Sequence, residues 1–338
     1  MRAYLLTRQK KNLRKCDVPI PTMGDDQILA KVMVCGVCRT DLHIIDGELT
    51  KPKLPLILGH QVVGLVEKTG KAVKNIKKGD LVGVPWLAWT CKKCRFCRNS
   101  KENLCENALF TGYTKDGGFA QYISSWEDYT IKLPNREPFL LAPLLCGGLI
   151  GHRAYQTLRK SLLGAKIGIF GLGSSGHIIT QIAVQEGYDV YVFVKRGDKN
   201  AVKLAEQVGA KWAGFSDRRP DFKLDGAIIF APVGELVSRA LEIVERGGVV
   251  VCAGIHMTDV PAFKYSILWG EKILTSVANL TRQDGQEFFA KISKLAISPK
   301  VNIYSLDQVN EALEDLKLGK ITGSIVLDVS TSTGKAKK

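Results

Sequence analysis

Four cysteines with the spacing of a metal site occupy residues 91–105. Two residues separate Cys91 from Cys94 and Cys94 from Cys97, and seven residues separate Cys97 from Cys105. Four thiolates this close in sequence can surround one Zn²⁺ tetrahedrally, and soft metal sites prefer thiolate ligands. Such a site is closed and structural, because protein atoms fill every position. An iron–sulfur cluster and simple burial of free thiols are the competing interpretations, but basic residues between the cysteines argue against a dry core.

A second set of potential ligands lies upstream, in residues 35–43 and 59–64. The first segment reads Cys-Gly-Val-Cys-Arg-Thr-Asp-Leu-His and the second reads Gly-His-Gln-Val-Val-Gly. Cys35 and Cys38 have the spacing of a redox pair, but no thioredoxin-like βαβ pattern surrounds them. A single histidine after glycine is more often a hydrogen-bonded loop residue than a ligand. Neither segment predicts a site by itself.

A glycine-rich turn follows a strand of buried character. Gly171, Gly173 and Gly176 come directly after the apolar run 166–170 and open the apolar helical pattern 177–187. Between a strand and a helix, G-x-G-x-x-G is typical of dinucleotide sites. Its glycines permit a tight turn and let the pyrophosphate approach N–H groups at the helix N-terminus. This context predicts a dinucleotide-binding domain.

The residues around this turn alternate between strand and helix patterns. Strands are predicted at 166–170, 190–194, 226–230 and 249–255, and helices at 177–187, 201–210 and 236–248. The alternation predicts right-handed βαβ units and a doubly wound parallel sheet, which is an α/β fold. Two further helices, 285–296 and 306–319, precede a last strand at 324–329.

The first 140 residues have a different character. Apolar, β-rich segments at 28–37 and 62–68 are separated by glycine and proline, and a Lys-Gly-Asp turn at 78–80 leads into another short strand. We expect this region to consist of short strands and loops, without helices.

The composition is that of a globular protein long enough for two domains, with 338 residues of which 45% are hydrophobic. No apolar run approaches the roughly 20 residues that span a bilayer, and the N-terminus lacks a signal-peptide pattern. We therefore expect a cytoplasmic protein that binds no membrane. The net charge is +15, but outside the tail Gly334–Lys338 the basic residues are scattered, which argues against nucleic-acid binding. Nine cysteines without a secretion signal point to metal rather than disulfides.

In combination, these motifs resemble those of one enzyme family. The Cys-Arg-Thr-Asp-x-His segment, the Gly-His pair, the four-cysteine segment and the glycine-rich turn follow the order found in zinc-containing medium-chain alcohol dehydrogenases. The nearest resemblance is to the branch related to cinnamyl-alcohol dehydrogenases. It implies a GroES-like β-rich catalytic domain, residues 1–147 and 283–338, with the structural zinc lobe at 91–105. It also implies a Rossmann dinucleotide-binding domain, residues 148–282, with the substrate in the cleft between the domains.

The resemblance further implies two zinc ions per subunit. The catalytic zinc would be bound by Cys38, His60 and Cys146, with one position open for water or the substrate oxygen. The structural zinc would be bound by Cys91, Cys94, Cys97 and Cys105. The remaining cysteines are interpreted as ordinary thiols; they are Cys16, Cys35 and Cys252.

Residues next to the first catalytic ligand take roles by the same resemblance. Thr40 and His43 would carry the alcohol proton to solvent by way of the cofactor ribose, an exit that suits the near-neutral pKa of a histidine in water. Arg39 would meet the cofactor pyrophosphate, and Asp41 would orient His60.

The substrate pocket is predicted less directly. Trp86, Leu87 and Leu49 correspond to positions that line it in the family, although an ordinary core explains Trp86 almost as well. Gln61 departs from the family pattern, which commonly has an acidic residue after the zinc histidine. The substitution removes a negative charge near the metal without removing a ligand.

Lys195 and Arg196 lie where an NAD site normally carries a carboxylate, about 20 residues beyond the glycine-rich turn. Two cations there would attract the 2′-phosphate of NADP. The sequence therefore predicts a preference for NADP, with NAD as the alternative if Asp198 serves the ribose.

The function implied is hydride transfer between an alcohol and NAD(P), giving an aldehyde or ketone, in a homo-oligomer of two or four subunits. A polyol dehydrogenase of the same superfamily is the alternative among enzymes, although that branch normally uses a glutamate near the zinc. A nonenzymatic zinc-ribbon protein that binds nucleic acid would explain residues 91–105 and the charge. It would leave His60, Cys146 and the glycine-rich turn unexplained.

Overall fold

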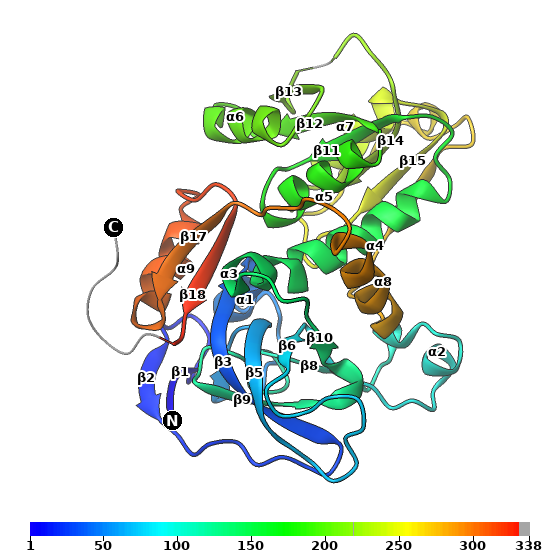
Figure 1. The fold of residues 1–338 in the computed structure, drawn as a ribbon. Coiled ribbons are helices and arrows are strands. Elements are labelled where there is room, and N and C mark those ends of the chain that lie inside the picture. Colours follow the sequence, from blue (N-terminus) through cyan, green and yellow to red (C-terminus); the bar gives the residue numbers. More distant parts are fainter. Residues whose placement is uncertain (219, 331–338) are drawn as a thin grey trace. The chain divides into compact units, whose positions relative to one another are not determined.

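The computed structural model describes residues 1–218 and 220–330, so the basic tail Gly334–Lys338 lies outside the described residues. The chain forms two compact units (Figure 1). The N-terminal unit comprises Met1–Cys146, Asn279–Ser293 and the described part of Lys300–Lys338, and the inserted unit comprises Gly147–Ala278 and Lys294–Pro299. Among the described residues, every helix is too short or too polar to cross a lipid bilayer.

The inserted unit is built on a six-stranded parallel sheet. Its strands lie in the order β13 (Trp212–Phe215), β12 (Asp189–Val194), β11 (Lys166–Phe170), β14 (Leu224–Ile229), β15 (Val244–Cys252) and β16 (Ile273–Ser276). The strand order changes direction between β11 and β14, which is the doubly wound Rossmann arrangement. The predicted α/β class is confirmed.

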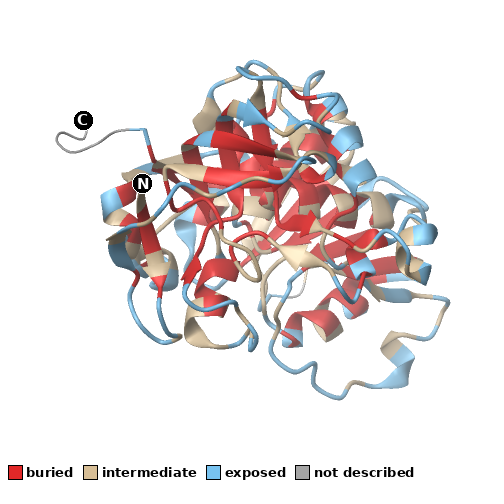
Figure 2. Cartoon of the chain, turned by 90° about the horizontal axis from the view of Figure 1, so that it is seen from below, coloured by how far each residue is buried: buried red, intermediate tan, exposed pale blue. Residues whose placement is uncertain are grey.

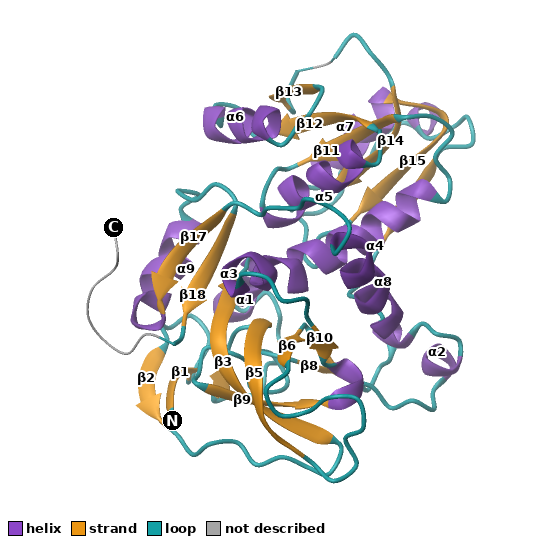
Figure 3. Ribbon diagram, in the orientation of Figure 1, coloured by secondary structure: helices purple, strands orange, loops and turns teal. Residues whose placement is uncertain are grey.

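Helices pack on this sheet and bury its strands (Figures 2 and 3); they are α4 (Gly147–Arg159), α5 (Ser174–Gln185), α6 (Lys199–Gln207) and α7 (Glu235–Ile243). The core includes Phe170 and Phe193 on adjacent strands, whose rings stack with centroids 4.4 Å apart. Near-continuous apolar runs such as residues 190–194 are therefore buried on both faces, as parallel strands require.

One helix of the inserted unit is shorter than the sequence predicts. We expected a helix over 236–248, but α7 ends at Ile243 and residues 244–248 begin strand β15. Val244 pairs with Leu224 of β14, and the register then shifts before Gly226 pairs with Val249. Sheet pairing thus overrides the helical pattern, aided by the positive φ of 71° at Gly247, which a helix cannot accommodate.

The N-terminal unit is mainly antiparallel. Its largest sheet orders β10 (Ile131–Lys132), β6 (Leu81–Val84), β5 (Gln61–Thr69), β3 (Gln27–Val37), β18 (Ser324–Asp328) and β17 (Val301–Ser305), and β9 (Tyr122–Trp126) also pairs with β3. Smaller sheets join β2 (Arg14–Asp17), β1 (Arg2–Leu6) and β4 (Leu56–Ile57), and β7 (Leu87–Trp89) with β8 (Leu109–Phe110). The helices of this unit are α1 (Arg39–Asp46), α2 (Arg95–Arg98), α3 (Pro138–Leu141), α8 (Arg282–Ile292) and α9 (Val309–Lys317).

The expectation that the first 140 residues contain no helix is wrong at α1, at the short helix α2 and at the start of α3. A capping box starts α1, because the Cys38 side chain accepts the Thr40 N–H while the Asp41 carboxylate accepts the Cys38 N–H at 2.9 Å. Gly47 ends it in the left-handed conformation. A cysteine is an unusual cap, so the sequence pattern did not reveal this helix.

Candidate metal centres and dinucleotide turn

The structure brings Cys38, His60 and Cys146 together. Their ligand atoms all lie within 4.8 Å of one another, and the Sγ atoms of Cys38 and Cys146 are 3.9 Å apart. Two thiolates on one tetrahedral zinc would be separated by about 3.8 Å, given a zinc–sulfur bond of about 2.3 Å. The pair therefore has the spacing of one edge of a zinc tetrahedron.

Each of these residues is positioned by a distinct local device. Cys38 caps α1, and Cys146 directly follows the 3-10 helix Ala142–Leu145, which packs against β3 and β5. His60 follows Gly59, whose φ of 94° turns the chain from β4 into β5. A Cβ atom on Gly59 would lie 2.8 Å from the Cys35 sulfur, so this buried thiol has a packing role.

His60 lies in a fully buried, partly polar environment. Its Nδ1 atom is 3.4 Å from the carboxylate of Asp41, which is also fully buried, and the edge of its ring faces Trp86 with centroids 5.0 Å apart. Within the described residues, His60 Nε2 makes no hydrogen bond. A buried ring nitrogen without a partner is costly unless it binds a ligand, and a metal ion held with Cys38 and Cys146 meets that requirement.

The electrostatics of the cluster suit a cationic metal. The hydrogen bond with Cys146 holds the pKa of the Cys38 thiol well below its usual value against the opposing effect of burial. The same interaction, with burial, raises the pKa of Cys146. Burial disfavours protonated His60, but Asp41 and Cys38 outweigh it and raise the pKa of His60 to about 10. A metal ion would replace these protons, so its binding depends on pH.

Cys91, Cys94, Cys97 and Cys105 also converge, with all four sulfur atoms within 4.8 Å of one another. Individual Sγ–Sγ distances are 3.5 Å for Cys94–Cys97, 3.6 Å for Cys105–Cys91 and 4.0 Å for Cys91–Cys97. These distances fit one tetrahedral ion, whereas a cluster of several iron ions would require more widely spaced thiolates. Backbone N–H groups of Lys93 and Cys94 lower the pKa of Cys91 to about 6, which favours a thiolate.

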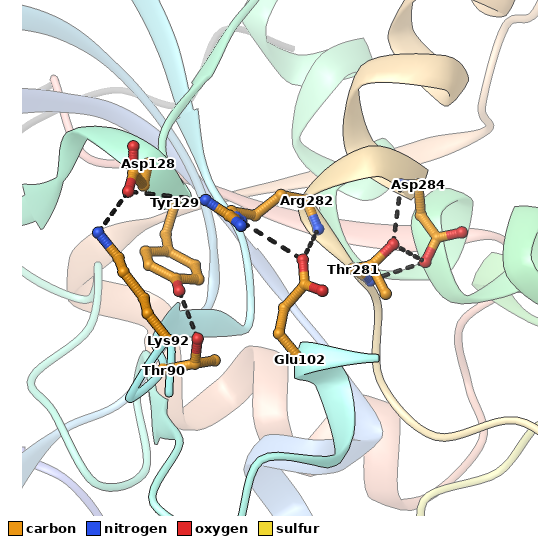
Figure 4. Close-up of polar contacts among 8 residues, drawn as sticks. All are labelled: Thr90, Lys92, Glu102, Asp128, Tyr129, Thr281, Arg282 and Asp284. Carbon is orange, nitrogen blue, oxygen red and sulfur yellow. Dashed lines mark hydrogen bonds and ion pairs between the residues drawn. The ribbon is translucent and has the colours of Figure 1, made fainter. Parts of the chain in front are cut away.

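A polar cluster anchors this four-cysteine lobe to α8 (Figure 4). The buried Glu102 accepts hydrogen bonds from the Arg282 backbone N–H at 3.0 Å and from its Nε at 3.3 Å. Arg282 also lies 3.6 Å from Asp128, which pairs with Lys92 at 2.6 Å. Arg282 therefore ties both ends of the lobe to the first turn of α8, a role that the sequence did not reveal.

Thr40 and His43 lie three residues apart on α1, so their side chains share one face of the helix. Thr40 Oγ1 is 3.4 Å from the Cys38 sulfur. His43 Nδ1 contacts the carboxylate of Glu48, which the turn after α1 brings back to the helix because the Glu48 N–H donates to the His43 carbonyl oxygen. Sequence reasoning missed Glu48, and only the turn geometry identifies it.

The three predicted pocket residues occupy different places. Trp86 lies beside His60, and its ring stacks with the rings of Phe110 and Tyr113 at centroid distances of 5.2 and 5.8 Å. The other two have different surroundings: Leu87 lines a cavity of about 820 Å³ next to the four-cysteine lobe, and Leu49 lies on the turn after α1.

The exposed Arg39 begins α1, and Gln61 packs against Gly36 of β3.

The glycine-rich turn of the inserted unit has room for a phosphate. Gly171 has a φ of 94°, and a Cβ atom on Gly176 would lie 2.2 Å from the Gly171 carbonyl oxygen, so both positions require glycine. Gly173 caps the N-terminus of α5, and a Cβ atom there would meet no atom within 4 Å. The turn is tight where it packs and open where a pyrophosphate would approach the helix.

Lys195 and Arg196 are exposed directly after β12. Arg196 lies 3.4 Å from Asp217. The carboxylate of Asp198 accepts the Ala201 N–H at 2.9 Å and caps α6. The nearest acidic residue beyond the strand is thus already engaged by a helix N-terminus.

Comparisons with known proteins agree with these features. The sequence profile of the alcohol dehydrogenase GroES-like domain matches residues 24–135, and that of the coenzyme F420-dependent NADP oxidoreductases matches residues 166–280. The probable alcohol dehydrogenase AdhA of Mycobacterium tuberculosis is 41% identical, over 93% of this chain and 92% of its own. A cinnamyl alcohol dehydrogenase from Sorghum bicolor has a TM-score of 0.90 at 26% identity, covering 99% of both chains. The structure of the enzyme CAD from Helicobacter pylori with NADP(H) has a TM-score of 0.88 at 25% identity, covering 98% of this chain and 99% of that one.

Proposed function

The chain belongs to the zinc-containing medium-chain alcohol dehydrogenases, and from that membership we propose that Cys38, His60 and Cys146 hold its catalytic zinc. The protein is an alcohol dehydrogenase that binds zinc and NAD(P) and acts on a small-molecule substrate. The convergence of two thiols on a buried histidine nitrogen without a hydrogen bond carries the assignment of the site. The N-terminal unit is then the catalytic domain and the inserted unit the dinucleotide-binding domain.

The activity is tested by following the absorbance of NADPH or NADH with a panel of aldehydes and ketones. Oxidation of either cofactor with at least one carbonyl compound is expected, and its absence across a broad panel would contradict the assignment. Position 146 is a cysteine, where the polyol dehydrogenase branch uses a glutamate. This residue favours an alcohol dehydrogenase over a polyol dehydrogenase.

Each group contributes a defined part of the chemistry. A zinc ion held at this site would supply Lewis acidity that stabilises negative charge on the alcohol oxygen, and a nicotinamide cofactor would supply the hydride acceptor. Asp41 fixes the orientation of His60, and Trp86 excludes water from one side of it. Trp86 is the predicted pocket residue whose position best supports a role in substrate binding. Cys91, Cys94, Cys97 and Cys105 hold a second, structural zinc, which gives two ions per subunit.

The alcohol proton leaves along one face of α1. The Thr40 hydroxyl lies beside Cys38 and could accept the proton, and His43 on the same helix face could release it to solvent. A bound cofactor would supply ribose hydroxyl groups for this relay. The Glu48 carboxylate contacts Nδ1 of His43 and would hold the imidazole ring in one orientation. The carboxylate also stabilises the imidazolium that forms, as an acidic partner of a catalytic histidine does.

This relay predicts a pH-dependent loss of activity. His43→Gln is expected to slow alcohol oxidation roughly tenfold or more at pH 6 and less than threefold at pH 9, because hydroxide can accept the proton directly at high pH. Glu48→Gln should change the pH–rate profile in the same direction with a smaller amplitude. The measurement is kcat for alcohol oxidation across this pH range.

Asp46→Asn is the matched control for the relay, since it removes a carboxylate from the same end of α1. Asp46 pairs with Lys317 of α9 at 2.9 Å rather than with His43. Its profile should match that of the unmodified enzyme. A native profile for Glu48→Gln would remove Glu48 from the relay.

We propose that NADP(H) is the preferred cofactor. Lys195 and Arg196 lie exposed at the end of β12, Arg196 pairs with Asp217 at 3.4 Å, and the Asp198 carboxylate is engaged as the cap of α6. A 2′-phosphate carries roughly −1.5 to −2 charges by analogy with other phosphate monoesters, so it is attracted here. The neighbour from Helicobacter pylori, whose structure contains NADP(H), supports the same choice.

The expected preference for NADP over NAD is at least about tenfold in kcat/KM, which requires about 1.4 kcal/mol. Lys195→Asp should reverse or abolish it, because a carboxylate repels the 2′-phosphate and can bind the ribose hydroxyl. Lys203→Asp makes the same charge change on the exposed side of α6 and serves as the control. Equal efficiency with NAD in the unmodified enzyme would defeat this assignment.

We also propose that the protein forms a homo-oligomer through one edge of the parallel sheet. Strand β16 ends the parallel sheet, and exposed apolar side chains on and near it include Ile273, Leu274 and Trp269. An unpaired strand edge with apolar side chains is a template for pairing with a second chain. A homo-oligomer that uses this edge would cover these residues.

A further inference from the structure

A second cavity of the N-terminal unit lies apart from both cysteine clusters. It has a volume of about 520 Å³, within the range of about 300–1,000 Å³ that is typical of small-molecule sites. Its walls are largely apolar and include Leu5, Pro19, Ile57, Leu109 and Ile123. The charged groups of its lining are the side chains of Lys53, Lys115 and Asp116 and the N-terminal ammonium group of Met1.

Among the described residues, the Lys115 ammonium group forms no ion pair of its own. It donates hydrogen bonds to the carbonyl oxygen and, at 3.3 Å, to the hydroxyl oxygen of Ser124, and it lies 5.6 Å from the centre of the Trp126 ring. These partners are neutral. Burial lowers the pKa of Lys115 to about 8, and the proximity of Lys53 acts in the same direction while Asp116 opposes it.

Asp116, the one carboxylate among the lining residues, is already engaged. It forms an ion pair with Lys53, and its other oxygen accepts the Ile57 N–H at 3.1 Å. Lys115 therefore presents a partly desolvated positive charge to an apolar cavity. Such a charge is costly unless a counter-ion pairs with it.

We propose that this cavity binds a small monocarboxylate with an apolar body, whose carboxylate pairs with Lys115. The Lys115 ammonium group suits one negative charge, and the apolar walls suit a hydrocarbon chain or ring. The N-terminal ammonium group of Met1, which also lines the cavity, donates to the Val18 carbonyl oxygen at 2.6 Å. Inorganic phosphate matches the charge but leaves the walls uncovered. The inference is independent of the proposed reaction, because the lining includes none of the seven cysteine and histidine ligands assigned above.

The cavity adjoins the segment that leads to His60. The Gly117 N–H donates to the Ile57 carbonyl oxygen at 2.7 Å, and the Gly118 N–H donates to the Gly59 carbonyl oxygen at 2.8 Å. A ligand on Lys115 would therefore lie against a loop bonded to the backbone just before a proposed zinc ligand.

The test is isothermal titration of the zinc-loaded protein with octanoate and with octanamide, its neutral counterpart. Octanoate should saturate one site per chain and bind at least about tenfold more tightly than octanamide. In Lys115→Met, which keeps the length of the side chain, octanoate should bind at least about tenfold more weakly. Octanamide binding should be unchanged in this variant.

Lys53→Met is the matched control, since Lys53 already has a carboxylate partner; octanoate affinity should change less than threefold. If octanoate bound instead to a metal ion, its affinity would be the same in Lys115→Met as in the unmodified protein. Unchanged affinity in that variant would therefore overturn the proposal. Equal affinity of the unmodified protein for octanoate and octanamide would also overturn it, without any variant having to fold.

Discussion

His60→Ala is expected to lower kcat by at least about a thousandfold while NADP(H) still binds. His60 supplies a proposed zinc ligand from the centre of a buried cluster, and a metal held by the two remaining cysteines would be distorted and weakly bound. Cofactor binding should persist, because the glycine-rich turn belongs to the separate inserted unit. The measurements are steady-state kcat, zinc content per chain, and NADPH affinity by fluorescence titration.

Cys38→Ser should give the same result, and Cys35→Ser is its matched control. Both cysteines lie within three residues on the same segment, but the Cys35 sulfur packs against Gly59 and is not part of the cluster. The control should keep its zinc content and lose less than about fivefold in kcat. Near-native kcat in His60→Ala, with one zinc ion fewer per chain, would show that these residues do not hold the catalytic metal.

The second large effect is expected at the four-cysteine lobe. Cys94→Ser should reduce the zinc content from two ions to one per chain and lower the Tm by roughly 5–10 °C, before any change in the chemical step. Cys94 contacts Cys97 through sulfur and also caps α2, so its loss removes a ligand and loosens the lobe. Differential scanning calorimetry and metal analysis provide the measurements.

Cys16→Ser is the control for the lobe, because this thiol lies on β2, outside both clusters. Its Tm and zinc content should match those of the unmodified protein. Iron with visible absorbance in the purified protein would contradict the zinc assignment, and an unchanged Tm for Cys94→Ser would remove the structural role of the lobe.

The sequence revealed those parts of the site that depend on local spacing. The four cysteines of the lobe lie within 15 residues of one another, and the glycine-rich turn adjoins its strand and helix, so each pattern could be interpreted alone. Cys146 is 108 residues from Cys38, and only resemblance to a family connected the two. The parallel sheet was also predictable, because buried parallel strands have continuous apolar runs.

Other features depend on contacts that no local pattern encodes. Helix α1 was missed because cysteine is not a usual helix cap, and Glu48 was missed because a left-handed turn at Gly47 brings it back to His43. Strand β16 has little apolar character beyond Ile273 and Leu274, and it forms because β15 offers it a partner. The Arg282–Glu102 contact joins residues 180 positions apart.

The pairing of β3 with β18 has a consequence for how the protein is made. β3 holds the residues just before Cys38, yet Val37 pairs with Ile325, near the end of the described chain. During synthesis the ribosome completes the inserted unit before β18 is available to pair with β3. The thiols of the first 146 residues therefore remain in an incompletely formed sheet during this interval. The sheet of the N-terminal unit therefore cannot be completed until β18 has been synthesised, and this interval exposes the nascent chain to aggregation and its cysteines to oxidation.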